Sequence, residues 1–378
     1  MKILAINFGG IGDEIFFLPT LISLKKEFPN SKITLALEPR SKSVKDLTSV
    51  IDDLFLIDIK GKNKYIELLK LVWLARLGKF DMVISSGGNK LISLLLFMTG
   101  IKKRYGYYTG ALSEKLLTKA VSLNKNQYAC DMYHDLVTPL TGHKTYLPEI
   151  DVEPQEKIPN SVLIHPGVSK MSVQKGMVKT ISAEVWAETI DLLVKKGKHV
   201  ILAGGPDDKE VIETIRTKCL PCQRDLLTSH CHSEHNNQRS FANAQDDRCE
   251  ESLNNEKLTM PCQREGERDA VEGFFEDFYG KTKNLKDLAE LIGKVEIFIC
   301  SDSAPLHVAV AMKTKTYVIF GPTDDKKLIP QSPLVIPVKA DDTCPIKPCL
   351  WEYRQTTCEN LDCLKITAED IVNNFVVK

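Results

Sequence analysis

Residues 2–28 read KILAINFGGIGDEIFFLPTLISLKKEF, and this stretch decides the fold. Residues 2–7 form an apolar run, three glycines within residues 9–12 interrupt it, and apolar residues recur at helical spacing over residues 13–28. This order predicts a β-strand, a tight glycine turn and an α-helix. It is the first half of a βαβ unit.

The same alternation continues through the first half of the chain. The pattern predicts strands at 32–37, 54–57 and 82–85, and helices at 43–50, 64–77 and 90–98. Strands that alternate with helices build βαβ units, in which the strands pair in parallel. We therefore expect a parallel α/β domain here.

The alternation restarts after residues 151–160, where prolines and charges indicate a linker. The pattern then predicts strands at 162–165, 199–203, 296–300 and 316–320, and helices at 183–196, 208–217 and 304–312. A chain of 378 residues is also too long for one compact domain and fits two of about 150 to 200 residues. We expect one domain at 1–155, a second at 156–360 and a C-terminal helix at 361–378, with a cleft between the domains.

One segment of the second domain, at about 219–269, does not follow this alternation. It is polar, repeats Pro-Cys-Gln-Arg at 221 and 261, and contains five cysteines and three histidines. Cys219, Cys222 and Cys231 with these histidines could be read as a zinc site, but the spacings do not form two paired ligand motifs. We expect a disordered surface insertion.

Charge is balanced over the whole chain but not locally. Lys+Arg and Asp+Glu both number 50, so the composition predicts no general attraction to nucleic acid. Residues 60–125, however, contain thirteen Lys and Arg but only three acidic residues, Glu67, Asp81 and Glu114. Such a basic region is typical of peripheral contact with an anionic membrane, although a solvated helix surface would have the same composition.

The apolar runs are too short to predict a membrane span. The longest, at 91–98, ends well before the roughly 18 to 20 residues that cross a bilayer. Near the N-terminus, Asp13 and Glu14 interrupt the apolar run before it reaches the length of a secretory signal. We expect a cytoplasmic protein, in peripheral contact with the inner face of the plasma membrane.

The first glycine turn is similar to part of a dinucleotide-binding fingerprint. Gly10 and Gly12 fit it, but Ile15 stands where the third glycine is required, and Glu38 lies only roughly where an acidic residue would hold a ribose. An NAD-dependent oxidoreductase is therefore one interpretation. Asp13, at the mouth of the predicted cleft, is explained most simply as a helix N-cap when it is considered alone.

Two loops of the second domain suit phosphate binding. Residues 300–307 read CSDSAPLH and open a helix, whose backbone N–H groups and dipole can bind an anion. Residues 165–169 read HPGVS, and Lys175 and Lys179 follow. Capping, solvation or ordinary packing would explain each feature alone, but two such loops at one sheet edge favour a diphosphate ligand.

Four ordered motifs resemble those of glycosyltransferase family 9, the heptosyltransferases of lipopolysaccharide core assembly. Residues 3–21 resemble its N-terminal signature, and residues 301–309 with FGPTD at 320–324 resemble its Asp-Ser/Thr-Gly-x-x-His-Leu…Phe-Gly-Pro-Thr signature. Residues 165–169 and the Gly-Gly-Pro at 204–206 occur in the same order. The resemblance covers nearly the whole chain outside the insertion.

This resemblance implies a GT-B architecture, with two Rossmann-like doubly wound parallel-sheet domains facing a cleft. It implies that the first domain binds a lipid-linked saccharide acceptor near Gly10 and Gly12, and that the second binds a nucleotide-sugar, ADP-heptose. Asp13 matches the catalytic base of the family. The matches in the donor site are Ser169, Lys179, Asp302, Ser303, Ala304 and His307.

Two departures from the family concern the donor site. Ala304 replaces the usual glycine, and residues 180–182, Thr-Ile-Ser, stand where the family often has an aromatic residue and a proline. These differences leave the identity of the donor open. The fold does not depend on them.

The implied reaction is an inverting glycosyl transfer. Asp13 would take the proton of the acceptor hydroxyl, while Lys179 and the helix that starts near Ala304 would stabilise the departing diphosphate. Because the chain contains no Asp-x-Asp motif, we expect no obligatory metal, and no cofactor is implied. The alternatives are the NAD-dependent oxidoreductase and a catalytically inactive relative that binds nucleotides.

Overall fold

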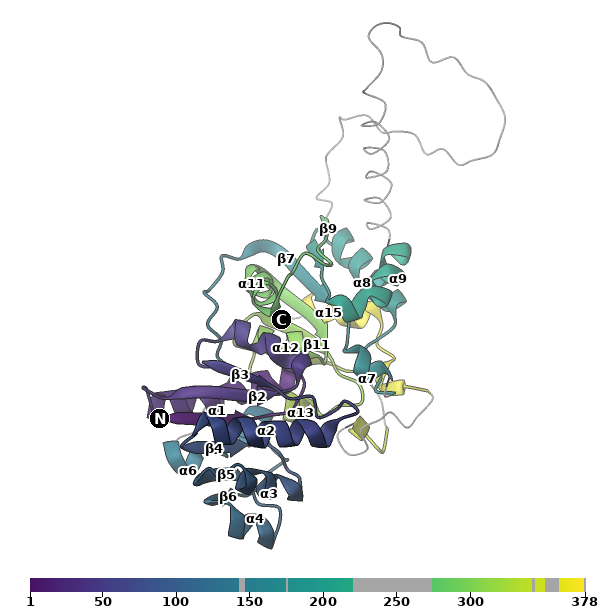
Figure 1. Ribbon diagram of the computed structural model, residues 1–378. Coiled ribbons are helices and arrows are strands. Elements are labelled where there is room, and N and C mark those ends of the chain that lie inside the picture. The colour runs from purple at the N-terminus through teal and green to yellow at the C-terminus, as the bar shows by residue number, and fades with distance from the viewer. Residues whose placement is uncertain (143–146, 175, 220–273, 342–343, 351–359, 377–378) are drawn as a thin grey trace, which may run out of the picture.

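The computed structural model describes residues 1–142, 147–174, 176–219, 274–341, 344–350 and 360–376. It shows two six-stranded parallel sheets, which lie one above the other in Figure 1. The insertion expected at 219–269, and with it the zinc interpretation, falls outside the described residues apart from Cys219.

The first sheet has the order β3-β2-β1-β4-β5-β6, with every pair parallel. Its strands are β1 (Lys2–Ile6), β2 (Lys32–Leu37), β3 (Asp53–Leu56), β4 (Met82–Ser85), β5 (Lys103–Tyr107) and β6 (Lys119–Val121). Its helices are α1 (Ile11–Glu27), the 3₁₀ helix η1 (Pro39–Leu47), α2 (Lys64–Gly78), α3 (Lys90–Met98), α4 (Ala111–Leu116), α5 (Ala129–His134) and α6 (Thr138–Thr141).

The second sheet has the order β12-β11-β10-β7-β8-β9, again with parallel pairs throughout. Its strands are β7 (Ile158–His165), β8 (His199–Leu202), β9 (Phe275–Asp277), β10 (Val295–Ser301), β11 (Lys315–Ile319) and β12 (Val335–Val338). The helices are α7 (Lys170–Gln174), α8 (Ala183–Lys195), η2 (Pro206–Asp208), α9 (Lys209–Lys218), α11 (Leu285–Lys294), α12 (Ala304–Ala311), α13 (Asp325–Leu328), η3 (Asp362–Leu364) and α15 (Ala368–Val376).

Both sheets have the same strand order. When the strands of each are numbered along the chain, the order is 3-2-1-4-5-6, which is that of a doubly wound nucleotide-binding domain. In such a sheet the strand order reverses between strands 1 and 4, and ligands bind at the carboxyl ends of these two parallel strands. The prediction of two doubly wound parallel α/β domains is confirmed.

The two faces of the first sheet are covered by different helices. Ile3 and Ala5 of β1 pack in one apolar cluster with α1 and α5, whereas Leu4 and Ile6 pack in another with buried residues of α2 and α3. This division follows from the alternation of side chains along a strand. Helix α1 therefore lies on the face opposite to α2 and α3.

The domains meet through α1 and η1 of the first and α12 and α11 of the second. Phe16 and Phe17 of α1 belong to the same apolar cluster as Leu306 and Val308 of α12. The core is thus continuous across the interface, which holds the start of α1 against the start of α12.

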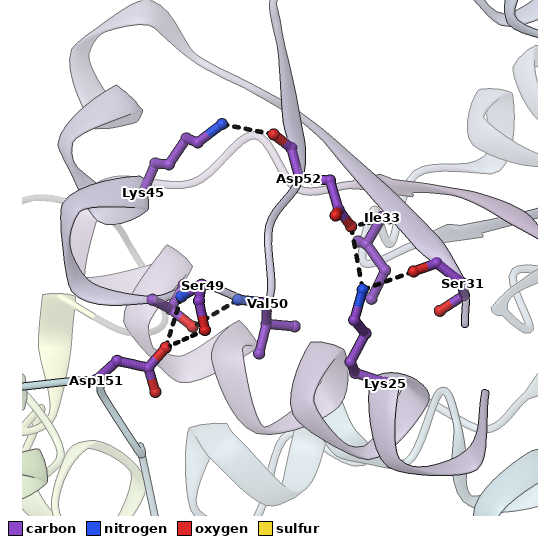
Figure 2. Close-up of polar contacts among 9 residues, drawn as sticks. Lys25, Ser31, Ile33, Lys45, Ser49, Val50, Asp52 and Asp151 are labelled. Carbon is purple, nitrogen blue, oxygen red and sulfur yellow. Dashed lines mark hydrogen bonds and ion pairs between the residues drawn. The ribbon is translucent and has the colours of Figure 1, made fainter. Parts of the chain in front are cut away.

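Hydrogen bonds and an ion pair stabilise the turn at residues 48–52, which follows η1 (Figure 2). The carboxylate of Asp52 accepts hydrogen bonds from the backbone N–H of Ile33 at 2.7 Å and from the ammonium of Lys25 at 3.3 Å. Burial alone would raise the pKa of Asp52, but these two donors hold it below its ordinary value. Asp151, at the start of the linker, accepts from both the N–H and the hydroxyl of Ser49 at 2.6 Å. The linker is therefore tied to the first domain.

Candidate active site

The predicted site residues lie where the chain leaves the central strands of the two sheets. Asp13 follows β1, and the loop at 86–89 follows β4 in the first sheet. In the second sheet, the loop at 166–169 follows β7, and residues 302–304 follow β10. These four connections lie at the two positions where the strand order reverses, and the contact between α1 and α12 brings the two sets together.

The carboxylate of Asp13 is held at both oxygens. Oδ2 accepts from the backbone N–H of Gly10 at 2.8 Å, so Asp13 does close the helix start, as the capping interpretation requires. Oδ1 accepts from the hydroxyl of Tyr133 at 3.2 Å. Burial, and then the charge of Asp13, raise the pKa of Tyr133 well above its ordinary value, so that the phenol stays protonated as a donor.

Asp13 also lines a pocket of about 760 Å³. The polar part of its lining includes Ser86 and Asn89 from the loop after β4, Tyr107 from β5, and Lys125. Leu350, whose N–H donates to the carbonyl of Pro322 in the second domain, also lines the pocket. The half-buried carboxylate of Asp13 therefore faces a pocket that is lined by residues of both domains.

Asp208 of the second domain caps a helix start as Asp13 does, but it does not line the pocket. Asp208 accepts from the N–H of Gly205 at 2.8 Å, as Asp13 does from Gly10. Asp208, however, is buried beside His165, with Nε2 of the imidazole 3.6 Å from its carboxylate. Capping thus explains the position of both carboxylates, whereas only Asp13 lines the pocket.

Glu14, the neighbour of Asp13, is almost completely buried, with 1% of its surface exposed. Burial is the main cause that raises its pKa well above the ordinary value, and the charge of Asp13 raises it further. Burial therefore favours the protonated, neutral form of Glu14 more than it does for an exposed glutamate.

Lys179 and Asp302 form an ion pair in the second domain. Nζ of Lys179 lies 2.9 Å from Oδ2 of Asp302, and the two side chains are 22% and 4% exposed. Burial alone would raise the pKa of Asp302, but the ammonium of Lys179 and, more weakly, the imidazole of His307 hold it below its ordinary value. The pair places one ammonium beside the loop that opens α12.

Thr180 fixes the backbone next to Lys179. Its hydroxyl donates to the carbonyl of Pro166 at 2.8 Å and accepts from Nε1 of Trp186 at 3.1 Å. The hydroxyl of Ser301, the last residue of β10, lies 2.7 Å away. Thr180, at a position that departs from the family pattern, therefore joins the loop after β7 to β10.

The two helix starts touch at Gly12 and His307. A methyl group on Gly12 would lie 2.9 Å from Cδ2 of His307 and 3.9 Å from Cα of Ala304, so only a glycine allows this approach. The rings of Phe16 and His307 lie 4.1 Å apart between centroids. Burial lowers the pKa of His307 to about 4, against the pull of Asp302 and Asp13, so the imidazole is neutral at pH 7.

The remaining predicted residues are less enclosed. Ser303 is the N-cap of α12 and donates weakly to the carbonyl of Ser301 at 3.4 Å, and Ala304 is half-buried at the helix start. Ser169 is exposed immediately before α7, where its carbonyl accepts from the N–H groups of Ser172 and Val173. Ser169 therefore lies at the surface of the loop after β7.

Sequence reasoning missed several residues around Asp13. Tyr133 follows it by 120 positions, and no local pattern distinguishes this tyrosine from others. Asn7 holds the helix start through a bond from its amide to the carbonyl of Asp13 at 3.2 Å, and Ser86 donates to Asn7 at 2.7 Å. The position of Asn7, two residues before the first glycine of the turn, was the one available signal.

The features that favoured NAD do not form a nucleotide site here. Ile15 is fully buried in the core, and Glu38, the expected ribose ligand, is 2% exposed. Burial raises the pKa of Glu38, which accords with a carboxyl group enclosed by protein. Gly12 is covered by His307, so the start of α1 faces the other domain.

Comparisons with known proteins find similarity to heptosyltransferases. The sequence model of glycosyltransferase family 9 (heptosyltransferase) matches residues 263–353. A curated relative, lipopolysaccharide heptosyltransferase 3 of Escherichia coli, is 22% identical over 328 residues, which cover 83% of this chain and 81% of the relative. In the described part of the chain, no helix is long and apolar enough to cross a membrane.

Solved structures share the fold over nearly the whole chain. The family 9 glycosyltransferase of Veillonella parvula is similar with a TM-score of 0.67 at 19% identity, over 98% of this chain and 95% of that one. The E. coli heptosyltransferase WaaC with ADP-2-deoxy-2-fluoro heptose is similar with a TM-score of 0.63 at 14% identity, over 100% and 99%. The GT-B arrangement implied by the motifs is confirmed.

Proposed function

From the premise that this chain belongs to glycosyltransferase family 9 and is a glycosyltransferase, we propose that it transfers heptose from ADP-heptose to a lipopolysaccharide-core or related lipid-linked glycan. The name of the E. coli relative supports the acceptor, and the ADP-heptose analogue bound to WaaC supports the donor. The alternatives to this proposal are the NAD-dependent oxidoreductase and a catalytically inactive relative, and measured turnover of the sugar donor distinguishes it from both.

One observation carries the proposal. The carboxylate of Asp13 lines the pocket, while Gly12, the residue before it, lies against His307 of the second domain. An acceptor in the pocket and a donor at the start of α12 would therefore have their reacting atoms close together. Such positioning accounts for a large share of the rate acceleration in two-substrate enzymes.

The reaction then proceeds by direct displacement. The carboxylate of Asp13 takes the proton of the acceptor hydroxyl as the oxygen attacks the anomeric carbon of heptose. The bond from that carbon to the diphosphate oxygen breaks on the opposite side, so the configuration inverts and ADP leaves. The two hydrogen bonds to Asp13, from Gly10 and Tyr133, hold the carboxylate in place for this proton transfer.

Positive charge stabilises the leaving diphosphate. Lys179 has two further ammonium hydrogens besides the one that faces Asp302. At the start of α12, the N–H of Ala304 has no acceptor within the helix, whereas Pro305 has no N–H and the N–H of Leu306 donates to the carbonyl of Ser303 at 3.1 Å. Ammonium and helix dipole together offset the charge that develops on the diphosphate. We propose that Ser169 and Ser303 contact the same phosphates, and that the transfer needs no metal.

The substitution Asp13→Asn tests the proposal. With ADP-heptose and a truncated lipopolysaccharide acceptor, in the presence of EDTA, we expect wild-type protein to turn over and the variant to be slower by roughly 10² to 10⁴. Melting temperatures should stay close, because the amide can still accept a hydrogen bond from Gly10.

A matched control separates catalysis from capping. Asn284→Ala removes the cap of α11, whose side chain accepts from the N–H of Asp287 at 2.8 Å, and should cost about 1 kcal/mol of stability without affecting turnover. If Asp13→Asn turned over as fast as the wild type, Asp13 would have only a capping role. If the wild-type protein lost its turnover in EDTA, the metal-free mechanism would be overturned.

A further inference from the structure

Helix α2 carries a line of exposed apolar side chains. Tyr65, Leu69, Trp73 and Leu77 are spaced by four residues and are between 59% and 78% exposed. Residues at this spacing lie along one side of a helix. The other side of α2 is buried through Leu71, Val72 and Ala75 and packs against the first sheet. The exposed apolar side chains are therefore not needed for the packing of α2 in the fold.

Helix α3 extends the apolar surface. Leu91, Leu94 and Phe97 are exposed on it. Nε of Arg76 in α2 donates to the carbonyl of Met98 at the end of α3 at 2.9 Å, which fixes the two helices side by side. In Figure 1 both helices belong to the lower domain and lie away from the second sheet. We call the surface formed by these seven side chains of α2 and α3 the α2–α3 face.

Lysines surround the α2–α3 face. Lys64 and Lys79 are exposed at the two ends of α2, and Lys90 is exposed at the start of α3. The one acidic side chain within α2 and α3 is Glu67, which lies 3.1 Å from Lys70. An apolar centre with a cationic rim complements a surface that is apolar inside and anionic outside.

We propose that the α2–α3 face binds an anionic lipid bilayer, with α2 lying parallel to the membrane surface. Trp and Tyr prefer the headgroup region, while Leu and Phe side chains enter the acyl boundary and lysines contact lipid phosphates. With 15 residues, α2 is about 22 Å long and lies along the membrane without crossing it. A second copy fits poorly, because a two-fold dimer through this face would place lysines opposite lysines.

The position of the pocket agrees with this orientation. Asn89 lines the pocket and is also the N-cap of α3, where its side chain accepts from the N–H of Leu91 at 2.9 Å. The pocket therefore opens beside one end of the α2–α3 face. A membrane-bound protein would have its acceptor pocket near the headgroups from which a lipid-linked acceptor projects. This point alone rests on the proposed function.

The first experiment measures binding without donor or acceptor, so its failure is distinguishable from failure of the transferase proposal. Full-length protein is sedimented with vesicles of phosphatidylcholine alone or mixed with phosphatidylglycerol, at low and high salt. We expect binding to the mixed vesicles that weakens at high salt without vanishing, because apolar insertion is not screened. Complete loss at high salt, or equal binding to both vesicles, would overturn the proposal.

Substitutions then locate the surface. Leu69→Gln/Leu77→Gln should reduce partitioning about tenfold or more, since two large apolar side chains no longer enter the membrane. The matched pair Trp73→Gln and Phe274→Gln changes aromatic residues of 60% and 62% exposure, and only the first should reduce binding. Unchanged melting temperatures are expected for all of them. Equal effects of the matched pair, or a change of oligomeric state with vesicle binding intact, would contradict the assignment.

Tryptophan fluorescence reports the depth of insertion. The chain has three tryptophans, of which Trp351 lies outside the described residues. Trp73 is exposed and Trp186 is fully buried, so we expect vesicles to shift the emission of the protein to shorter wavelength through Trp73. Trp73→Phe should keep the binding and lose the shift. A shift that persists in this variant would show that another part of the chain enters the membrane.

Discussion

The ion pair between Lys179 and Asp302 allows a prediction with a definite magnitude. We expect Lys179→Met to leave the Asp302 carboxylate, which is 4% exposed, without its nearest opposite charge. Removing one partner of a buried pair costs roughly 3 to 5 kcal/mol, and the partial exposure of Lys179, 22%, places this case at the lower end, at about 3 kcal/mol. For a chain of 378 residues this lowers the melting temperature by about 4 °C.

The dependence on pH distinguishes this cause from lost packing. In the wild type the pKa of Asp302 is below its ordinary value, so the contribution of the pair is present above about pH 4 and is lost as the pH falls through the lowered pKa. In the variant, burial without the ammonium raises that pKa, and stability then falls as the pH rises. The difference in melting temperature should therefore be largest near pH 8 and shrink towards pH 5.

Thermal unfolding followed by circular dichroism measures the effect, and two further variants control it. Lys339→Met breaks a pair of similar length, 2.8 Å to Asp325, in which the lysine is 40% exposed, and should cost less than about 1 kcal/mol. Asp302→Asn added to Lys179→Met should recover most of the loss, because no charge then stays buried. If Lys179→Met cost no more than Lys339→Met, or its cost did not vary with pH, the buried-charge reasoning would be refuted.

Two other substitutions address the interface and the buried acid beside Asp13. Gly12→Ala places a methyl group 2.9 Å from Cδ2 of His307, so the imidazole must move and the contact between the domains weakens. We expect a stability loss of about 1 to 3 kcal/mol and faster proteolysis between the domains, and a stability and a proteolysis rate equal to those of the wild type would contradict this contact. Glu14→Gln replaces a carboxyl group whose raised pKa makes folding less favourable as the pH rises. In urea unfolding we expect the variant to be more stable than the wild type at pH 8 and equally stable near pH 4, and a difference in unfolding free energy that did not vary with pH would show that Glu14 does not titrate.

Elements with a strong local signal were predicted with little error. The strand at 82–85 and the helix at 90–98 have the predicted bounds, and the helix at 64–77 ends one residue later. Central parallel strands are buried on both faces and therefore form continuous apolar runs, which the sequence displays directly.

Other elements had too little local signal. β6 and β9 are three residues long and lie at sheet edges, where an apolar run is not required. The helix expected at 43–50 is instead a 3₁₀ helix at Pro39–Leu47, which ends with a bond from Thr48 N–H to the carbonyl of Lys45. Its position depends on α1 and α11, which lie far away in the sequence.

The candidate site divides in the same way. The glycine turn with Asp13, and the loop that opens α12, are local motifs, so the sequence by itself determined which residues to examine and which two domains carry them. Only the tertiary structure decided that Tyr133 holds Asp13, that Gly12 touches His307, and that α2 leaves an apolar line uncovered. Local periodicity determines strands, turns and helices, whereas these contacts join residues far apart in the chain and exist only once the two sheets have packed together.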